Sequence, residues 1–144
     1  MARAKSSPRK HGVHLLEYRL PGGWKVLVGR TDVDNDYLSL RVARPDDWWF
    51  HVRGMPGSHV ILQGLPGEDP DRQTLKRAAG IAAYHSKARE GGVVVVSCTR
   101  ARYVTKPRDA KVGAVQIRKE VVFKVRPALD EAVIAQASDS AAER

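Results

Sequence analysis

The chain has 144 residues, 42% of them hydrophobic, which fits one folded domain with a single core. Its 25 lysines and arginines against 16 acids give a net charge of +9, which attracts nucleic-acid backbones or anionic membrane surfaces. No apolar run reaches the roughly 20 residues that cross a bilayer, and no apolar signal segment follows the first ten residues. We therefore expect a cytoplasmic protein with no membrane partner.

The N-terminal part is predicted to be an arm followed by a hairpin. Residues 1–12 are small, basic and polar, which indicates a flexible arm. Residues 13–20 and 24–29 are strand-like on either side of Pro21-Gly22-Gly23, which predicts a β-hairpin.

Residues 34–43 fit two structures. Leu38, Leu40 and Val42 alternate as they would in a strand, whereas the Asp34-Asn35-Asp36 cluster is typical of the start of a helix. Pro45 ends the segment in either case, because the residue before a proline is disfavoured in the helical conformation.

The stretch from Asp46 to Leu62 holds two of the three tryptophans and two of the five histidines. Residues 48–52 and 59–62 are predicted strands joined by a turn that contains Gly54, Pro56 and Gly57. The alternation of a strand places Trp48, Phe50 and Val52 in the core, and directs Trp49 and His51 toward a polar edge or site. His51 and His59 are expected to converge across the turn.

Residues 70–89 are predicted to form the long helix that covers the sheet. Asp69 fits the N-cap, Pro70 the first helical position, and Gly91-Gly92 the end. Its apolar face consists of Leu75, Ala78, Ala79, Ile81, Ala82 and His85.

The other face of this helix is basic. It consists of Lys76, Arg77, Gly80, Tyr84 and Lys87, with the glycine leaving the backbone approachable. Such a stripe is either an ordinary solvated face or a contact for nucleic acid, with cations on phosphates and a ring for stacking.

The C-terminal third carries a concentration of positive charge. Residues 93–104 predict a long strand in which Cys98 is buried and Arg100 and Arg102 share one face. A basic loop at 106–113 follows, and residues 115–118 and 120–125 are predicted to pair as strands. From 128 to 144 the composition shifts to alanine, serine and acids, which indicates a tail.

Several motifs together resemble those of one family. They are Asp47-x-Trp49-Phe50-His51, Pro56-Gly57-Ser58-His59, Ala78-Ala79 running to Tyr84-x-Ser86-Lys87, and Lys106-Pro107 followed by Gly113-x-Val115. In order and spacing they resemble the NFACT-R domain, also called DUF814, between about Trp24 and Pro127. The resemblance implies that residues 34–43 form a helix. It also implies RNA binding, because this domain is the RNA-binding module of ribosome quality control factors that engage tRNA and the large ribosomal subunit. The elongation and ribosome-anchoring roles of the long family members are not carried over. We expect a stand-alone form that lacks the other domains of the long family members.

These observations predict a single α+β domain over residues 13–127, with a mixed or mainly antiparallel sheet, one long helix at about 70–89 and a short helix at about 34–43. The predicted function is non-catalytic binding of tRNA or ribosomal RNA without a cofactor, in translation quality control or RNA modification. The expected partners beyond RNA are the ribosome or an RNA-modifying enzyme. The cations are expected to form a continuous track beside the Trp48–Leu62 hairpin. The predicted contacts are Trp49, His51, Arg53, Ser58, His59, Lys76, Arg77, Tyr84, Lys87, Arg100, Arg102, Lys106 and Lys111.

Two other readings stay open. One is an RNA-processing or RNA-modifying enzyme with a His51/His59 pocket, although Ser58 and His59 are neighbours and point apart on extended backbone. The histidine spacing matches no known zinc site, so no metal is expected. The other reading is an adaptor that binds proteins on the ribosome.

Overall fold

The computed structural model describes residues 14–129 and 138–139. Its main sheet contains β1 (Leu15–Leu20), β2 (Trp24–Gly29), β3 (Trp48–Val52), β4 (Val60–Gln63), β5 (Val94–Arg100), β8 (Val121–Val125) and β9 (Ser138–Asp139). A two-stranded ribbon contains β6 (Val104–Thr105) and β7 (Gln116–Ile117). The helical segments are α1 (Asp32–Tyr37), η2 (Leu38–Val42), α2 (Arg72–Tyr84) and η3 (Ala101–Tyr103).

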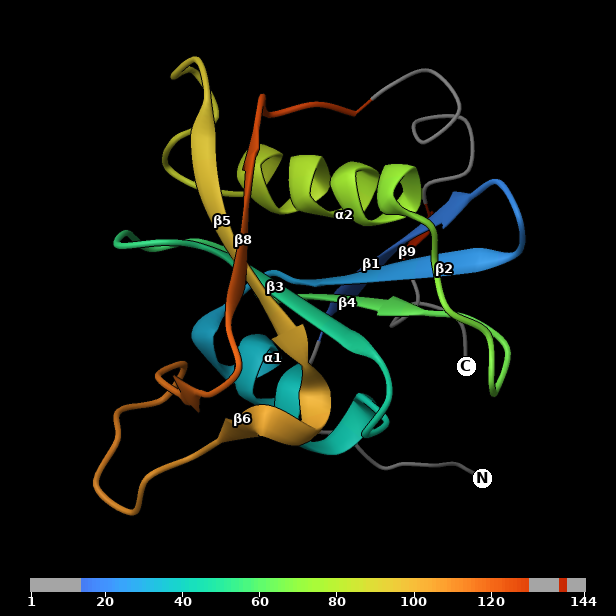
Figure 1. The fold of residues 1–144 in the computed structure, drawn as a ribbon. Coiled ribbons are helices and arrows are strands. Elements are labelled where there is room, and N and C mark those ends of the chain that lie inside the picture. Colours follow the sequence, from blue (N-terminus) through green and yellow to red (C-terminus); the bar gives the residue numbers. More distant parts are fainter. Residues whose placement is uncertain (1–13, 130–137, 140–144) are drawn as a thin grey trace.

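The main sheet has the order β8-β5-β3-β4-β2-β1-β9, and each neighbouring pair is antiparallel. Helix α2 covers one face, while α1 lies on the other (Figure 1). The α+β class and the mainly antiparallel sheet are as predicted. The expected hairpin of β1 and β2 is also present, with Leu20 opposite Trp24.

The ambiguous segment is a helix, as the family resemblance implied. It begins earlier than predicted, because the hydroxyl of Thr31 accepts a hydrogen bond from the Asp34 backbone N–H at 3.1 Å and caps the first turn. The last turn, η2, is a π-helix that ends where Ala43 becomes extended. The continuous helical segment of α1 and η2 therefore covers the second face of the sheet.

Helix α2 is shorter than the predicted helix of residues 70–89. Its N-cap is Asp71, which accepts a hydrogen bond from the Thr74 N–H at 2.8 Å, rather than Asp69. It ends at Tyr84 because the following backbone leaves the helix to pair with the β3–β4 turn, with a bridge between Gly57 and Ser86. The Ser86 hydroxyl also donates to the Ala83 carbonyl at 2.7 Å and closes the last turn. A tertiary contact therefore ends this helix.

Two hydrophobic clusters lie on opposite faces of the sheet. The first, under α2, includes Phe50, Val52 and Leu62, as the alternation in β3 predicted. The second lies under α1 and η2 and includes Leu38 and Trp49. Trp49 is only 3% exposed, so the prediction that it faces a polar edge was wrong. The error arose because the sheet is covered on both faces, so Trp49 is buried as well as Phe50 and Val52.

The C-terminal strands differ from the prediction in two ways. The long strand ends at Arg100, where η3 turns the chain. The two final strands do not pair with each other: β7 pairs with β6, and β8 pairs with β5. Lys119 has a φ of 59°, and this sharp turn sends the two strands to different partners. Cys98 is buried as predicted, and burial raises the pKa of its thiol to about 12.

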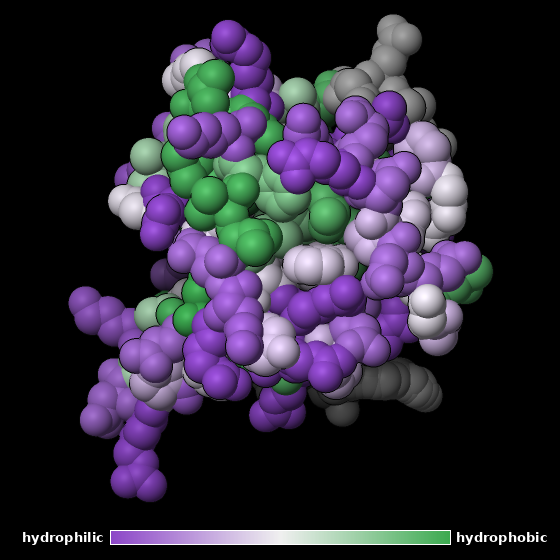
Figure 2. Space-filling model, in the orientation of Figure 1, coloured by the Kyte–Doolittle hydropathy of each residue, from purple (hydrophilic) through white to green (hydrophobic). Residues whose placement is uncertain are grey.

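The edge of the sheet at β8 carries apolar side chains. Val93, Val121 and Val122 are exposed there, and Figure 2 shows apolar residues gathered over this part of the surface, with hydrophilic residues over the ribbon of β6 and β7. In this view the apolar surface at β8 is therefore separate from the polar surface over β6 and β7.

The predicted arm, residues 1–12, lies outside the described residues, as does most of the predicted tail at 128–144. Two residues of that tail, Ser138 and Asp139, pair with β1 as strand β9. Among the described residues, no helix has both the length and the apolar character needed to cross a bilayer.

Candidate nucleic-acid interface

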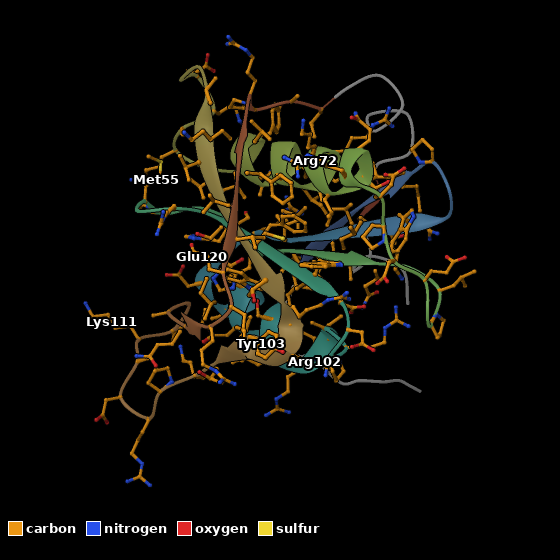
Figure 3. All side chains as sticks on the ribbon, in the orientation of Figure 1. Met55, Arg72, Arg102, Tyr103, Lys111 and Glu120 are labelled. Carbon is orange, nitrogen blue, oxygen red and sulfur yellow. The ribbon has the colours of Figure 1, made fainter. Side chains whose placement is uncertain are left out.

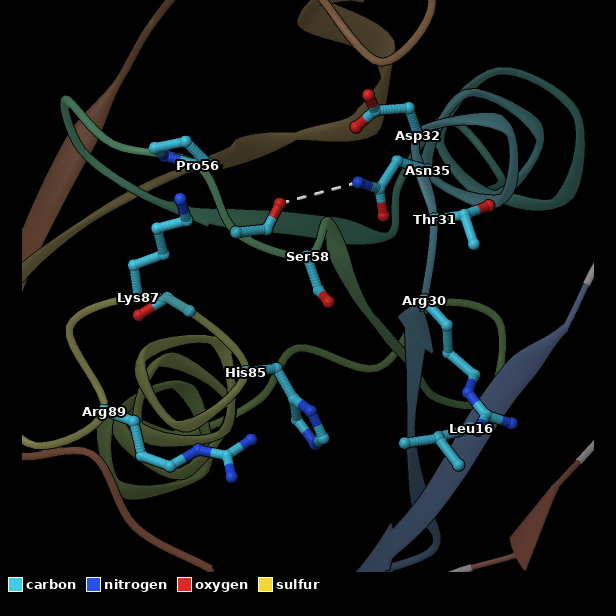
Figure 4. A pocket seen from close by; sticks show the side chains of 12 residues that line it. Leu16, Arg30, Thr31, Asp32, Asn35, Pro56, Ser58, His85, Lys87 and Arg89 are labelled. Carbon is cyan, nitrogen blue, oxygen red and sulfur yellow. Dashed lines mark hydrogen bonds between the residues drawn. The ribbon is translucent and has the colours of Figure 1, made fainter.

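A cleft of about 540 Å³ opens where three segments meet (Figure 4). The segments are the β3–β4 turn, the start of α1 and the residues that follow α2. The lining residues are Leu16, Arg30, Thr31, Asp32, Asn35, Pro56, Gly57, Ser58, His85, Ser86, Lys87 and Arg89. The size is that of a small-ligand site, and the lining combines cations with hydroxyl and amide groups.

Backbone contacts hold the turn against the end of α2. The Ser58 N–H donates to the His85 carbonyl at 3.0 Å, and the Lys87 N–H donates to the Pro56 carbonyl at 3.5 Å. A Cβ on Gly57 would lie 3.0 Å from the Cβ of Ser86, so the close approach favours glycine. The two walls of the cleft are therefore fixed relative to each other.

Asn35 ties α1 to the same turn. Its side-chain oxygen accepts a hydrogen bond from the His59 N–H at 3.0 Å, and its amide nitrogen donates to the Gly57 carbonyl at 3.5 Å. A Cβ on Gly29 would lie only 2.2 Å from the Asn35 oxygen, so the strand before α1 also has to be bare here. Asn35 thus determines where α1 stands at the cleft.

Three cations and one carboxylate line the cleft. Lys87 and Arg89 come from the segment after α2, and Arg30 comes from the end of β2. The Arg89 guanidinium lies 4.0 Å from the centre of the Tyr84 ring, and its Nε donates to the Tyr84 carbonyl at 2.6 Å. Asp32 lies across the cleft from Lys87 (Figure 4). The positive charge therefore gathers around one opening, where Tyr84 holds the Arg89 side chain in place.

His85 lies in the cleft as a neutral group. Its Nε2 and the Tyr18 hydroxyl are hydrogen-bonded at 2.8 Å. Burial, and next the charges of Arg89 and Arg30, lower the pKa of His85 to about 4. The positive charge of the cleft at neutral pH therefore comes from its arginines and lysine.

His51 and His59 converge as predicted, with ring centres 5.4 Å apart. They lie beside Trp49, and the Ser39 hydroxyl links the group by hydrogen bonds at 2.8 Å to His59 Nδ1 and 2.9 Å to Trp49 Nε1. His59 is 3% exposed, and burial followed by the nearby His51 lowers its pKa to about 4. These contacts make His59 and Trp49 part of the support behind the turn.

Residues 16–119 match the sequence model of the NFACT protein RNA binding domain. The chain belongs to this family.

Relatives include the Rqc2 homolog RqcH of Bacillus subtilis, which is 37% identical over 131 residues, and that of Streptococcus suis, which is 36% identical over 106. These matches cover 91% and 74% of this chain, but only 22% and 19% of the relatives. A ribosome quality control complex subunit NEMF homolog of Drosophila melanogaster is 31% identical over 86 residues, 60% of this chain and 8% of that protein. The chain thus spans about a fifth of the bacterial relatives.

A solved structure has the same fold. It is the C-terminal part of the fibronectin/fibrinogen-binding protein from Streptococcus suis, with a TM-score of 0.76 and 32% identity. The match covers 85% of this chain and 48% of that one.

Two NFACT-R motifs that are distant in sequence meet at the cleft. Pro56-Gly57-Ser58 forms one wall, and Ser86-Lys87 forms another. Ser58 and Lys87 were predicted contacts, and the structure brings them to one opening. The ring of Tyr84, another predicted contact, lies under the guanidinium of Arg89.

Seven polar residues of the cleft were not among the predicted contacts: Arg30, Thr31, Asp32, Asn35, His85, Ser86 and Arg89. They follow strand β2, begin α1 or follow α2, where a chain often presents polar side chains at the end of an element. That position was the only available signal, because their proximity depends on the tertiary structure.

Arg100, the last residue of β5, and Arg102 in η3 contact their own chain. Arg100 lies 4.1 Å from the Trp48 ring centre, donates to the Asp46 carbonyl at 2.7 Å and pairs with Asp69 at 3.1 Å. Arg102 pairs with the Asp46 carboxylate. Because the strand ends at Arg100, the expected face of alternating arginines is not formed.

The two lysines of the basic loop differ. Lys106 Nζ pairs with Asp36 at 3.1 Å, donates to the Ala114 carbonyl at 2.9 Å and contacts the Lys111 carbonyl. It therefore holds the loop together. Lys111 is exposed.

The basic face of α2 is also different from the prediction. Gly80 is buried, and its carbonyl accepts a hydrogen bond from the Ala128 N–H at 3.2 Å. The C-terminal segment of the same chain occupies the approach that was predicted for RNA. Lys76 is exposed and Arg77 is partly buried. On the β3–β4 turn, Arg53 pairs with Glu120 at 3.4 Å.

The predicted cations do not form one continuous track. Figure 3 shows Arg102 and Lys111 on the side of the sheet away from Arg72 of α2. Lys87 lies at the cleft near the end of α2. Within residues 14–129 and 138–139, no cluster of histidines, cysteines and acids is arranged to hold a metal ion.

Proposed function

We propose that this chain is a non-catalytic RNA-binding domain whose contact surface is the cleft between the β3–β4 turn, α1 and the end of α2. The observation that carries the proposal is the gathering of Arg30, Lys87 and Arg89 around one opening built from two NFACT-R motifs. Arginine and lysine bind phosphates, and Ser58 adds a hydroxyl group of the kind that binds phosphate or sugar.

The proposed RNA is tRNA or ribosomal RNA, bound in the cytoplasm during ribosome quality control. The names of the relatives support this context, since they are Rqc2 homologs and a ribosome quality control complex subunit homolog. The further partner would be the ribosome or an RNA-modifying enzyme. No catalytic step is part of the proposal, because His59 is engaged with Ser39 and His85 with Tyr18.

The test is the affinity of the purified protein for tRNA and for a ribosomal RNA fragment, measured by fluorescence anisotropy over a range of salt. Three phosphate contacts predict a slope of about −2 to −3 in log affinity against log salt. Lys87→Glu should weaken binding by about tenfold, because it places a carboxylate among the phosphates.

Lys76→Glu is the matched control. It makes the same charge change at an exposed lysine of α2 that is outside the cleft. Its effect should stay below about threefold, since distant surface charges are largely screened at physiological salt. Equal losses in the two variants, or affinity independent of salt, would contradict the proposal.

A further inference from the structure

Asp32 does not fit a cleft that binds only phosphate. It is a carboxylate among three cations, and a carboxylate repels phosphate oxygens. An ionised carboxylate is also only a hydrogen-bond acceptor, so its partner on a ligand has to be a donor. The donors of an RNA chain are the ribose hydroxyls and nitrogen-bound hydrogens of the bases, and the 2′-hydroxyl is the one found at each internal nucleotide and missing in DNA.

The surroundings of Asp32 limit where its carboxylate can lie. Gly113 has a φ of 88°, and a Cβ there would lie 2.8 Å from Oδ1 of Asp32. The loop before β7 therefore lies against the carboxylate on one side. Asn35, three residues later on α1, is held by the β3–β4 turn. The base of the carboxylate is thus held between two elements while its residue stays exposed to the cleft.

Asp32 faces two of the three cations across the cleft, while Arg30 lies on the same side as Asp32 (Figure 4). Lys87 and Arg89 come from the segment after α2, and Asp32 comes from α1 across the opening (Figure 4). A ligand that spans the cleft therefore has an anionic part on one side and a hydrogen-bond donor on the other. A ribonucleotide with its phosphate and its 2′-hydroxyl has both.

The size of the cleft favours an unpaired nucleotide. A volume of about 540 Å³ is in the range of sites for single small ligands. In a duplex the bases are paired and stacked, and the helix offers a broad surface that such a recess cannot enclose. An unpaired nucleotide can turn its phosphate and ribose into the recess.

We propose that the cleft binds one unpaired ribonucleotide of an RNA, with the phosphate on Lys87 and Arg89 and the ribose 2′-hydroxyl donating a hydrogen bond to the Asp32 carboxylate. Asp32 is then the residue by which the domain distinguishes RNA from DNA. This inference rests on the proposed RNA-binding function of the same cleft and adds the form of the RNA and the group that is recognised.

The first experiment uses the unaltered protein and three labelled single strands of one sequence: RNA, DNA and RNA with 2′-O-methyl groups. Fluorescence anisotropy should give RNA an affinity about tenfold higher than the other two, because both lack the hydroxyl donor to a charged acceptor. An RNA duplex of the same sequence should compete about tenfold less well than the single strand. Equal affinities for the three strands, or for duplex and single strand, would overturn the inference.

The second experiment compares Asp32→Ala with Asp109→Ala, which makes the same charge change at an exposed loop residue outside the cleft. Asp32→Ala should bring the ratio of RNA to DNA affinity close to one, whereas Asp109→Ala should keep it. Thermal unfolding checks the fold of both variants, and Asp32→Asn, with a weaker neutral acceptor, should give an intermediate ratio. An unchanged ratio in a folded Asp32→Ala protein would overturn the role of Asp32.

The outcomes separate this inference from the proposed function. If Lys87→Glu weakens RNA and DNA binding while Asp32→Ala leaves their ratio unchanged, the cleft binds polyanions without reading the ribose. If Lys87→Glu and Lys76→Glu weaken RNA binding equally, the proposed function itself fails.

Discussion

The cations of the cleft differ from Arg100 and Arg102, at the end of β5 and in η3, in the acceptor groups that lie close to them. Lys87 and Arg89 face an opening whose lining holds a single acid, Asp32. Arg100 and Arg102 lie beside Asp46 and Asp69, and their guanidinium groups pair with those acids or with a backbone carbonyl. The number of cations in a segment therefore predicts its electrostatic field but not its contacts, because nearby acids and carbonyls compete with an external ligand.

The histidines should give the largest effect on stability. The pKa values of His59 and His85 are lowered to about 4, whereas an unfolded chain has a histidine pKa near 6.5. Between pH 6.5 and 4 the unfolded chain binds protons that the folded protein does not, so the free energy of unfolding falls as the pH falls and levels off below pH 4. For the buried His59 the loss is about 3 kcal/mol.

Urea unfolding at pH 7, 5.5 and 4.5 measures this loss. In His59→Phe the unfolding free energy should fall less between pH 7 and pH 4.5 than in the wild type, because the contribution of His59 is absent. This holds even if the variant is less stable at pH 7. RNA binding gives a second pH test. Because His85 in the cleft stays neutral, the affinity for RNA should be similar at pH 7 and at pH 5.5. A sharp rise in affinity over that interval would assign charge to the histidine.

Lys106 is the next test, because it is a cation that acts inside the protein. Lys106→Met removes a group that pairs with Asp36 and donates to the Ala114 carbonyl. The free energy of unfolding should fall by about 1–3 kcal/mol, because these acceptors lose a charged partner. RNA affinity should change less than in Lys87→Glu.

Arg108→Met is the control for this variant, since Arg108 is an exposed cation of the same loop. Its unfolding free energy should stay within about 0.5 kcal/mol of the wild-type value. If Lys106→Met were as stable as Arg108→Met but lost RNA binding, Lys106 would contact RNA, as is proposed for the cleft cations, and would not stabilise the loop.

Arg102 should give the smallest effect. It pairs with Asp46 at an exposed position, and exposed pairs contribute about 0–1 kcal/mol. Arg102→Gln should therefore change the unfolding free energy by less than about 0.5 kcal/mol, and RNA affinity by less than about twofold if few phosphates lie near it. Calorimetry measures the unfolding free energy and fluorescence anisotropy the RNA affinity. A tenfold loss of affinity would mean that RNA displaces Asp46 from Arg102 and binds this arginine.

The sequence predicted local features well. The turn residues Pro21-Gly22-Gly23 correctly placed the first hairpin, and alternation correctly placed Phe50 and Val52 in the core. The family motifs led to the NFACT-R family and to the helix that begins at Asp32. These features depend on the conformational preferences of neighbouring residues and on the order of the motifs, and both can be read directly from the sequence.

The sequence determined by itself the α+β class, the basic field and most of the strands, because periodicity and charge are local properties. Only the tertiary structure decided which cations meet. Pairing of the β3–β4 turn with Ser86 ended α2 early and brought Lys87 and Arg89 to Arg30. Packing of α1 and η2 on the second face buried Trp49, and no strand pattern reveals whether a face will be covered.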